Sequence, residues 1–198
     1  ATIGGIALDK TGTLTANRPA VIDVATTNGA TGEEVLAVAA ALEARSEHPL
    51  AAALLAAAPA PIAAADDVQA IPGSGLTGHL DGHPVRLGRP GWLEPADLAD
   101  EVARMQQAGA TVVLVERDKK LLGAIAVRDE LRPEAGEVIA ALHAGRYEVA
   151  MLTGDNHATA AALAAQAGID TVYAELRPED KAALIRQLRS QRPTAMVG

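Results

Sequence analysis

A short polar run near the start of the chain, residues 9–15 with the sequence DKTGTLT, combines the groups that phosphoryl transfer requires. It follows the apolar residues 3–8, which predict a short buried strand. Open α/β sheets bind ligands outside the carboxyl ends of their strands, where an aspartate such as Asp9 can act as a covalent nucleophile. The glycine and threonines that follow offer N–H groups and hydroxyls to an anion. The pattern predicts that Asp9 accepts a phosphoryl group; the simpler alternative is a glycine- and threonine-rich turn with a solvated aspartate.

A second strand end with similar chemistry lies near residue 153. The apolar residues 148–152 lead into Thr153-Gly154-Asp155 and then into an expected helix. A helix N-terminus carries partial positive charge and free N–H groups, which favour a phosphate. We expect Thr153 to donate a hydrogen bond to a phosphoryl oxygen, and Asp155 to cap the helix or to help orient Mg²⁺ and nucleotide. Alone, these residues would predict an ordinary helix start, but together with the Asp9 motif they indicate a phosphate site.

A lysine opens the next predicted helix. Lys181 lies in the first turn after Arg177-Pro178, where a cation is unfavourable for the helix dipole. Phosphoryl transfer needs cations where negative charge accumulates. Lys181 is therefore either a solvated surface residue or the cation of the phosphate site.

The elements that must position these residues fall into two groups. After Asp129, helices and strands alternate, which indicates a parallel sheet, and the strand before Asp9 is expected to join it. The segment between them predicts helices beginning near Thr31 and Pro49, a helix over 95–108 and several short strands around glycine-rich turns. We therefore expect an α/β fold in which an α+β domain with an antiparallel sheet is inserted into a parallel-sheet domain. The expected boundaries are 1–17 and 127–198 for the parallel-sheet domain, and 18–126 for the inserted one.

Composition excludes several classes of protein. The formal net charge of −8 and the lack of a Lys/Arg stripe argue against a nucleic-acid partner. The chain has no cysteine, which excludes disulfides, thiol nucleophiles and thiolate metal sites. The most apolar stretch, residues 49–65, is rich in alanine and interrupted by prolines, so it does not predict a membrane span. We expect a soluble segment without direct membrane insertion.

The DKTGTLT run resembles the phosphorylation motif of P-type ATPases, and Thr153-Gly154-Asp155 resembles their TGD element. Lys181 stands where the haloacid dehalogenase-like superfamily, which includes these pumps, has a phosphate-contacting lysine. The resemblance implies a catalytic set of Asp9, Lys10, Thr11, Thr153, Gly154, Asp155 and Lys181. It also implies a haloacid dehalogenase-like phosphorylation (P) domain with an inserted nucleotide-binding (N) domain.

Thr11 distinguishes between reaction types within that superfamily. Its soluble phosphatases usually carry a second aspartate two positions after the nucleophile, as general acid and base. Thr11 occupies that position here and cannot act as a general base near neutral pH. The phosphoaspartate is therefore expected to persist, as a pump requires.

The inserted domain carries the sequence SEHPL, which resembles a signature of the heavy-metal (P1B or CPx) subfamily. The resemblance implies that His48 and Glu43 contact the adenine of ATP, and that Gly73 and Gly75 belong to a glycine-rich nucleotide loop. From the residues alone, His48 could equally be a capping or core histidine, and the glycine loop a plain β-turn. The loop joins two expected strands rather than a strand and a helix, which excludes a Rossmann dinucleotide site.

Asp129 and Arg132 resemble the D-x-x-R hinge segment of the family, and we group them with the cofactor-binding residues. An ordinary charged helix start is the alternative. The expected cofactors are ATP and Mg²⁺, with Asp9 and Thr11 as the ligands of Mg²⁺.

In the family, a GDGxND segment that completes the Mg²⁺ site follows the position of Gly198. The chain is thus expected to be a cytosolic loop of a cell-membrane pump, truncated before that segment, with an incomplete Mg²⁺ site and little or no turnover. Its expected partners are ATP, a transported metal ion that binds to absent membrane helices, and the actuator domain of the same pump. Two other functions stay open: a soluble haloacid dehalogenase-like phosphohydrolase and a non-catalytic nucleotide-sensing module.

Overall fold

The computed structural model describes residues 3–198, which divide into two compact units. The parallel-sheet unit contains residues 3–18, 107–109 and 129–198. The antiparallel-sheet unit contains residues 19–106 and 110–128. Each unit has its own sheet and its own hydrophobic core.

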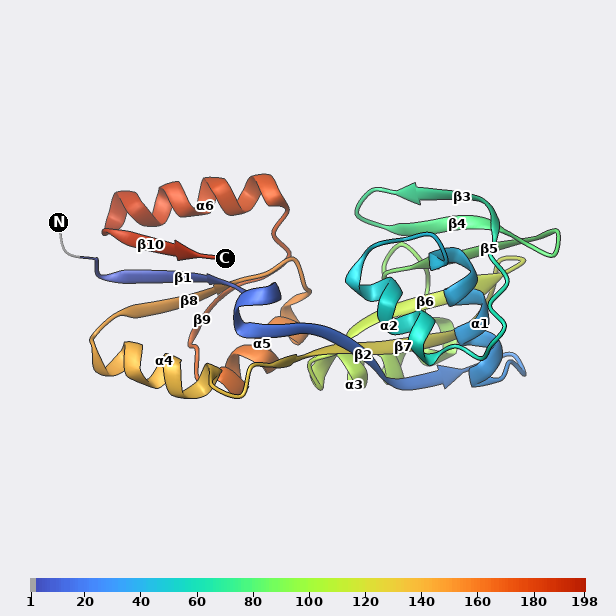
Figure 1. The fold of residues 1–198 in the computed structure, drawn as a ribbon, viewed down its shortest axis with the longest axis horizontal. Coiled ribbons are helices and arrows are strands. Elements are labelled where there is room, and N and C mark those ends of the chain that lie inside the picture. The colour runs from blue at the N-terminus through green and yellow to red at the C-terminus, as the bar shows by residue number, and fades with distance from the viewer. Residues whose placement is uncertain (1–2) are drawn as a thin grey trace. The chain divides into compact units, whose positions relative to one another are not determined.

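The sheet of the first unit has four parallel strands in the order β10-β1-β8-β9 (Figure 1). Their bounds are Thr194–Val197 for β10, Gly5–Asp9 for β1, Glu148–Leu152 for β8 and Thr171–Tyr173 for β9. In the register of the central pair, Asp9 lies opposite Leu152. The last residue of β1 and the residue after β8, Thr153, therefore lie at the same edge of the sheet.

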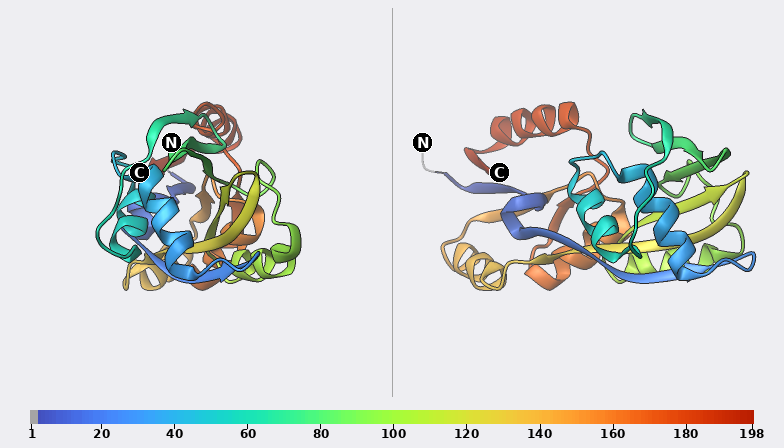
Figure 2. Two further views of the ribbon diagram at one scale, coloured as in Figure 1. Left: turned by 90° about the vertical axis from the view of Figure 1, so that its right-hand side faces the viewer. Right: turned by 45° about the vertical axis from the view of Figure 1, so that its right-hand side comes forward.

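Three helices cover the parallel sheet, α4 and α5 on one face and α6 on the other (Figure 2). Leu8, Val149 and Met151 of the sheet pack against Ile139 of α4 and Leu163 of α5. Alanines fill much of the remaining space, which lets the helices approach the sheet closely. The bounds are Ala135–Ala144 for α4, His157–Ala167 for α5 and Pro178–Gln191 for α6.

The second sheet has six strands in the order β2-β7-β6-β5-β4-β3, of which β3 to β7 form an antiparallel meander. The strands are Thr15–Thr26 (β2), Asp66–Ile71 (β3), Gly75–Leu80 (β4), His83–Gly88 (β5), Thr111–Arg117 (β6) and Lys120–Leu131 (β7). β2 runs through Asn17, Arg18 and Pro19, across the expected boundary between residues 17 and 18. An edge strand tolerates the missing N–H of Pro19, and Asn17 adopts a positive φ of 56°.

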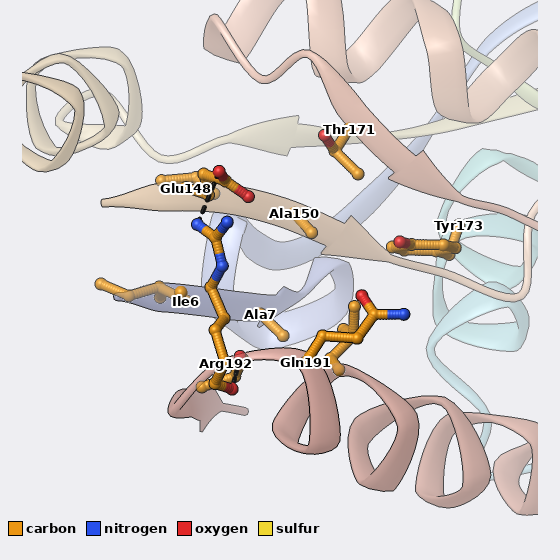
Figure 3. Close-up of a pocket in the computed structure, with 12 residues that line it drawn as sticks. Ile6, Ala7, Glu148, Ala150, Thr171, Tyr173, Gln191 and Arg192 are labelled. Atoms are coloured by element: carbon orange, nitrogen blue, oxygen red, sulfur yellow. Dashed lines mark hydrogen bonds and ion pairs between the residues drawn. The ribbon is translucent and has the colours of Figure 1, made fainter. Parts of the chain in front are cut away.

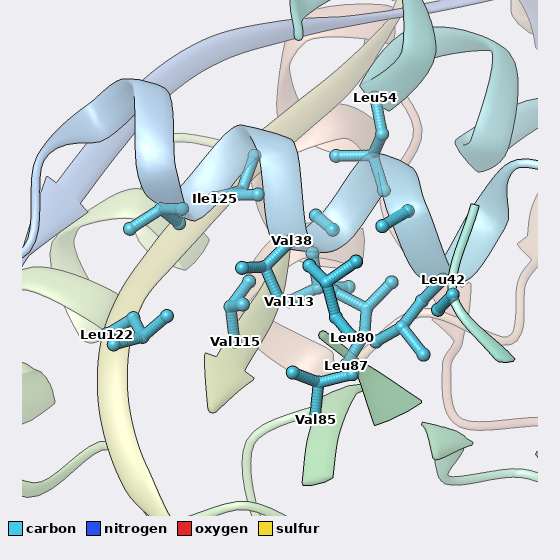
Figure 4. Close-up of a cluster of buried hydrophobic side chains, with 14 of the residues drawn as sticks. Val38, Leu42, Leu54, Leu80, Val85, Leu87, Val113, Val115, Leu122 and Ile125 are labelled. Carbon is cyan, nitrogen blue, oxygen red and sulfur yellow. The ribbon is translucent and has the colours of Figure 1, made fainter. Parts of the chain in front are cut away.

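Side chains of β6 alternate between two cores of this sheet, because successive residues of a strand point to opposite faces. Val113 and Val115 join the cluster under α1 (Gly32–Glu43) and α2 (Pro49–Ala57), which Figure 4 shows. Val112 and Leu114 join the other cluster, which packs against a short 3₁₀ helix, η2 (Ala96–Leu98), and α3 (Ala99–Gln107).

The structure confirms the expected fold class, a parallel-sheet α/β unit combined with an antiparallel α+β unit. Some bounds differ from the expectation: β1 extends to Asp9, so the predicted nucleophile is the last residue of the strand. The helix expected over 95–108 starts as the 3₁₀ turn η2 and continues as α3. Among residues 3–198, no helix combines the length and the apolar character needed to cross a bilayer.

Candidate active site

Asp9 and Lys181 form the centre of the site at the carboxyl edge of the parallel sheet. The Nζ atom of Lys181 lies 2.7 Å from Oδ1 of Asp9, and each side chain is 26% exposed. The same oxygen accepts the N–H of Lys10 at 2.9 Å. A capping interaction, in which the N–H of Arg177 donates to the carboxylate of Asp180 at 3.0 Å, fixes the start of α6. The helix thereby holds a cation beside the carboxylate that could act as a nucleophile.

A wide turn, η1 (Lys10–Leu14), connects Asp9 to β2. It is closed by the N–H of Thr15, which donates to the carbonyl of Lys10 across a π-type turn. Gly12 has a φ of 78°, a conformation that favours glycine, and Thr11 is extended and exposed. The hydroxyl of buried Thr15 donates to the carbonyl of Lys10 and accepts the N–H of Gly12, both at 3.3 Å. We call residues 10–14 the acceptor loop.

Thr153 and Asp155 follow β8 beside the acceptor loop. Thr153 is 2% exposed, and its hydroxyl oxygen accepts the N–H of Asp155 at 3.1 Å. Gly154 is exposed. The carboxylate of Asp155 forms an ion pair with Lys10, with 2.8 Å between Oδ2 and Nζ. The expectation that Asp155 caps the helix is wrong, because the cap of α5 is Asn156, whose side chain accepts the N–H of Thr159 at 3.0 Å.

The sequence analysis named Lys10 and Asp155 as site residues but did not predict that they form an ion pair. Their positions could have indicated the pair, because the two residues have opposite charges and lie just after the ends of two neighbouring parallel strands. Residues after the carboxyl ends of adjacent parallel strands meet at one edge, so such a pair is sterically accessible.

Asp129 and Arg132 lie at the end of β7, where the chain re-enters the parallel-sheet unit. The carboxylate of Asp129 accepts the N–H of Arg18 at 2.8 Å. The guanidinium of Arg132 donates to the carbonyls of Gly12 and Thr13, each at 3.0 Å. The structure thus brings Arg132 to the acceptor loop.

The oxygen atoms at this edge fit Mg²⁺, which prefers carboxylate, phosphate and water oxygens. Oδ1 of Asp9 is occupied by Lys181 and Lys10, whereas Oδ2 has no protein donor among residues 3–198. Within the same described range, no group of three or more His, Cys, Asp or Glu side chains could hold a metal without other ligands. Within the described residues, Asp9 supplies one free carboxylate oxygen, its Oδ2. Phosphate oxygens of a bound substrate would have to supply further ligands.

The residues predicted to contact adenine lie in the antiparallel-sheet unit. Glu43, the last residue of α1, is only 6% exposed, and its carboxylate has no donor among residues 3–198. His48 is exposed and caps α2, because its Nδ1 accepts the N–H of Leu50 at 3.1 Å. His48 thus has the capping role that the sequence left open. Because Nδ1 accepts this hydrogen bond, the neutral ring carries its proton on Nε2, which can donate to a ligand.

The glycine-rich loop is a tight connection between β3 and β4. Gly73 has a φ of 70° with open space around its Cα, and its carbonyl accepts a hydrogen bond from Nε of Arg89 at 2.6 Å. At Gly75 a Cβ would lie 2.1 Å from the carbonyl oxygen of Leu87. The need for glycine at position 75 is thus explained by packing against β5, whereas Gly73 leaves room for a ligand.

These three segments converge on one hydrophobic cluster (Figure 4). Leu42 precedes Glu43, Leu50 follows His48-Pro49, and Leu76 follows Gly75; all three leucines pack into or against that cluster. The predicted adenine-contacting residues are therefore held by a shared core.

The concavity shown in Figure 3 lies elsewhere, over the face of the parallel sheet next to α6. Its volume is about 250 Å³, and the ion pair of Arg192 with Glu148, at 2.6 Å, stands at one side of it. It is lined by the first residues of β1 and not by Asp9, so it is not the carboxylate site.

Comparison with known proteins places this arrangement in a family. The model of the haloacid dehalogenase-like hydrolases matches residues 3–198, which is the whole described chain. The chain belongs to the haloacid dehalogenase-like hydrolase family. The fold and the strand-end aspartate agree with this assignment.

Relatives within the family are P-type ATPases, as the sequence motifs predicted. The chain is 78% identical over 197 residues to the probable cation-transporting ATPase G of Mycobacterium tuberculosis, covering 100% of this chain and 25% of that protein. It is 41% identical over 206 residues to the probable copper-exporting P-type ATPase V of the same species, covering 99% and 27%. The chain spans about a quarter of the length of the curated relatives it matches.

Solved structures of the heavy-metal class show the same fold. A zinc-transporting PIB-type ATPase in the E2.Pi state matches with a TM-score of 0.70 and 37% identity, over 99% of this chain and 33% of that one. The catalytic CPx-ATPase domain CopB-B matches with a TM-score of 0.73 and 25% identity, over 100% and 71%. The chain thus resembles the cytosolic catalytic region of heavy-metal P-type ATPases over essentially its whole length.

Proposed function

We propose that this chain is the ATP-binding and phosphoryl-accepting region of a heavy-metal cation-transporting P-type ATPase. The observation that carries the proposal is the 2.7 Å contact of Lys181 with Asp9 at the carboxyl edge of a haloacid dehalogenase-like sheet. A carboxylate there, oriented by a cation and followed by a glycine-containing loop, is suited to attack a phosphoryl group.

The proposed reaction is the transfer of the γ-phosphoryl group of ATP to Asp9. A carboxylate oxygen of Asp9 forms a bond to the γ-phosphorus while the bond to the bridging β–γ oxygen breaks, and ADP leaves with that electron pair. Lys181, the hydroxyl of Thr153 and the N–H groups of the acceptor loop offset the charge on the transferring group. Asp9 and Thr11, together with phosphate oxygens of the nucleotide, would hold Mg²⁺, which would supply further charge neutralisation.

The phosphoaspartate is expected to be long-lived in this site. Thr11 is exposed and extended two residues after Asp9, where a carboxylate would be needed to activate water. A stable intermediate gives a pump time to change conformation before hydrolysis. The same feature disfavours a soluble phosphohydrolase.

The antiparallel-sheet unit is proposed to bind the nucleotide. The carboxylate of Glu43, which has no donor among residues 3–198, suits the amino group of adenine, and Nε2 of His48 supplies a donor. Gly73 leaves the space for a nucleotide beside its loop.

The relatives support a proposal about the partners and location of the whole protein. Those named above are called cation-transporting, copper-exporting and zinc-transporting ATPases. We propose a heavy-metal ion as the transported substrate, an actuator domain as the partner that promotes dephosphorylation, and a cytosolic position for this chain in a membrane protein.

Acid-quench labelling with γ-³²P-ATP tests the central claim in the pump that contains this chain. Asp9→Asn is expected to abolish an acid-stable, hydroxylamine-sensitive label, and Asp170→Asn, which changes an exposed aspartate, is the matched control. Labelling that survives in Asp9→Asn would exclude Asp9 as the acceptor. Binding of ATP without any label in the unaltered pump would favour a nucleotide-sensing module instead.

A further inference from the structure

One residue bonds to three successive carbonyl groups of the acceptor loop. The guanidinium of Arg132 donates from Nη2 to the carbonyl of Gly12 and from Nε to that of Thr13, each at 3.0 Å. The backbone N–H of the same residue donates to the carbonyl of Leu14 at 2.9 Å. The second half of the loop is thereby fixed by a residue more than a hundred positions away in the chain.

The bonds to Arg132 determine where the loop's N–H groups point. In a trans peptide unit, the C=O and N–H bonds point in opposite directions. Because the carbonyls of Gly12 and Thr13 face Arg132, the N–H groups of Thr13 and Leu14 point away from it. An anion bound on that side would meet the oriented N–H of Thr13, as in other backbone anion sites.

The loop has few other constraints at this point. The N–H of Thr15 closes its π-type turn, and the two bonds that the Thr15 hydroxyl makes within the loop are long, at 3.3 Å. Gly12, at positive φ, is also the residue with the most conformational freedom. Without Arg132, the peptide units after Gly12 would lose the bonds that orient the carbonyls of Gly12 and Thr13.

Arg132 itself is held firmly. It precedes Pro133, which restricts its backbone to extended conformations, and its carbonyl accepts the N–H of Ala135 at 3.0 Å. The bond from the N–H of Arg18 to Asp129 ties the end of β7 to the segment that leaves the loop. Arg132 bonds the two carbonyls from two different nitrogens in a rigid planar fork, a geometry that the single ammonium of lysine does not reproduce.

We propose that Arg132 is a positioning residue for phosphoryl transfer, one that fixes the acceptor loop so that Asp9 and the loop N–H groups meet the γ-phosphate. In this role Arg132 acts through the loop, whose carbonyls it bonds. This inference rests on the proposed function, since it assigns a role within the same reaction.

The test separates loop geometry from folding and from nucleotide binding. In the pump, Arg132→Lys and Arg132→Ala are expected to lower the labelling rate at saturating ATP by about 10- to 100-fold, as small misplacements of reacting groups do. The ATP concentration for half-maximal rate should change less than about twofold. Arg186→Lys, on an exposed position of α6, is the matched control.

A spectroscopic measurement on the chain itself completes the test. In ¹H–¹⁵N NMR spectra, Arg132→Lys should shift and broaden the amide signals of Thr13 and Leu14 while those of β8 stay in place. Unchanged amide signals, or labelling at the unaltered rate by folded Arg132→Ala, would overturn the inference. If the unaltered pump takes no label at Asp9, the proposed function fails, and the NMR spectra still decide whether Arg132 holds the loop.

Discussion

Lys10 and Asp155 form an ion pair across the carboxyl ends of β1 and β8, with 2.8 Å between Nζ and Oδ2. Asp9, next to Lys10 in the chain, pairs instead with Lys181. The two aspartates at the sheet edge thus have separate lysine partners. Asp9 thus pairs with the lysine at the start of α6, while Lys10 neutralises the second carboxylate at the same edge.

Breaking the Lys10–Asp155 pair is expected to destabilise the parallel-sheet unit. The two side chains are 13% and 15% exposed, so Lys10→Met removes the lysine charge beside a largely buried carboxylate, at a cost of about 1–3 kcal/mol. Asp155→Asn should lower the free energy of unfolding by a smaller amount. The double variant should lose less than the sum of the two single losses, by an interaction energy of about 1 kcal/mol or more. Hydrogen exchange of β8 amides measures these free energies. Additive effects would show that the pair makes no net contribution.

Removing the amine of Lys181 is expected to slow phosphoryl transfer without weakening ATP binding. Lys181→Met should lower the labelling rate of the pump by about 10²–10³-fold, since it removes a charge placed where the transition state is negative. Lys181→Arg should retain part of the rate. Lys120→Met, at an exposed lysine of β7, serves as control. Equal rates for Lys181→Met and the control would remove Lys181 from the mechanism.

The convergence of Asp9, Thr153 and Lys181 could be predicted from the sequence, because alternating strands and helices imply a parallel sheet whose strand ends share an edge. The pairing of individual groups could not. Whether Asp155 caps α5 or pairs with Lys10 depends on a competition with Asn156, which is equally suited to capping and lies one residue further on. The contact of Arg132 with the acceptor loop depends on the path of β7, which no local pattern specifies.

In the antiparallel-sheet unit, the sequence predicted most helices and strands, but it did not predict why particular positions, such as 75, need glycine. The glycine loop was expected to approach a ligand, yet the missing side chain of Gly75 faces the carbonyl of Leu87. Strand-to-strand packing of this kind depends on the register of β4 and β5. A hairpin signal at Asp81-Gly82 predicts that these strands pair, but not which residue faces a backbone atom.

Substitutions in the glycine loop should therefore differ in severity. Gly75→Ala places a Cβ 2.1 Å from a backbone oxygen and should destabilise the unit by about 3 kcal/mol. Gly73→Ala, at a φ of 70° with no atom within 4 Å, should cost about 1–2 kcal/mol. Urea unfolding followed by the fluorescence of Trp92, the single tryptophan, compares the two. A larger cost at Gly73 would contradict the packing explanation.

The two roles of His48 can be separated by substitution. Asparagine is a good N-cap residue but lacks the imidazole Nε2, so His48→Asn should retain the stability of α2 and weaken ATP binding. His48→Ala should weaken ATP binding equally and destabilise the unit by about 1 kcal/mol. Calorimetric titration with ATP and unfolding curves provide the two measurements. Unchanged affinity in both variants would remove His48 from the nucleotide site.

Glu43 is expected to lower the stability of the folded unit and to strengthen its binding of ATP. Glu43 is 6% exposed as a residue and its carboxylate has no donor within the described residues, so its charge loses part of its hydration on folding without gaining a hydrogen bond. Glu43→Gln, which keeps the size and removes the charge, should raise the unfolding midpoint without ATP. It should also weaken ATP binding about tenfold, because a charged acceptor bonds an amino group more strongly than an amide oxygen does. Glu94→Gln, at an exposed glutamate, should change neither quantity. If Glu43→Gln lowers stability and leaves ATP affinity unchanged, Glu43 is a structural residue and not a ligand of adenine.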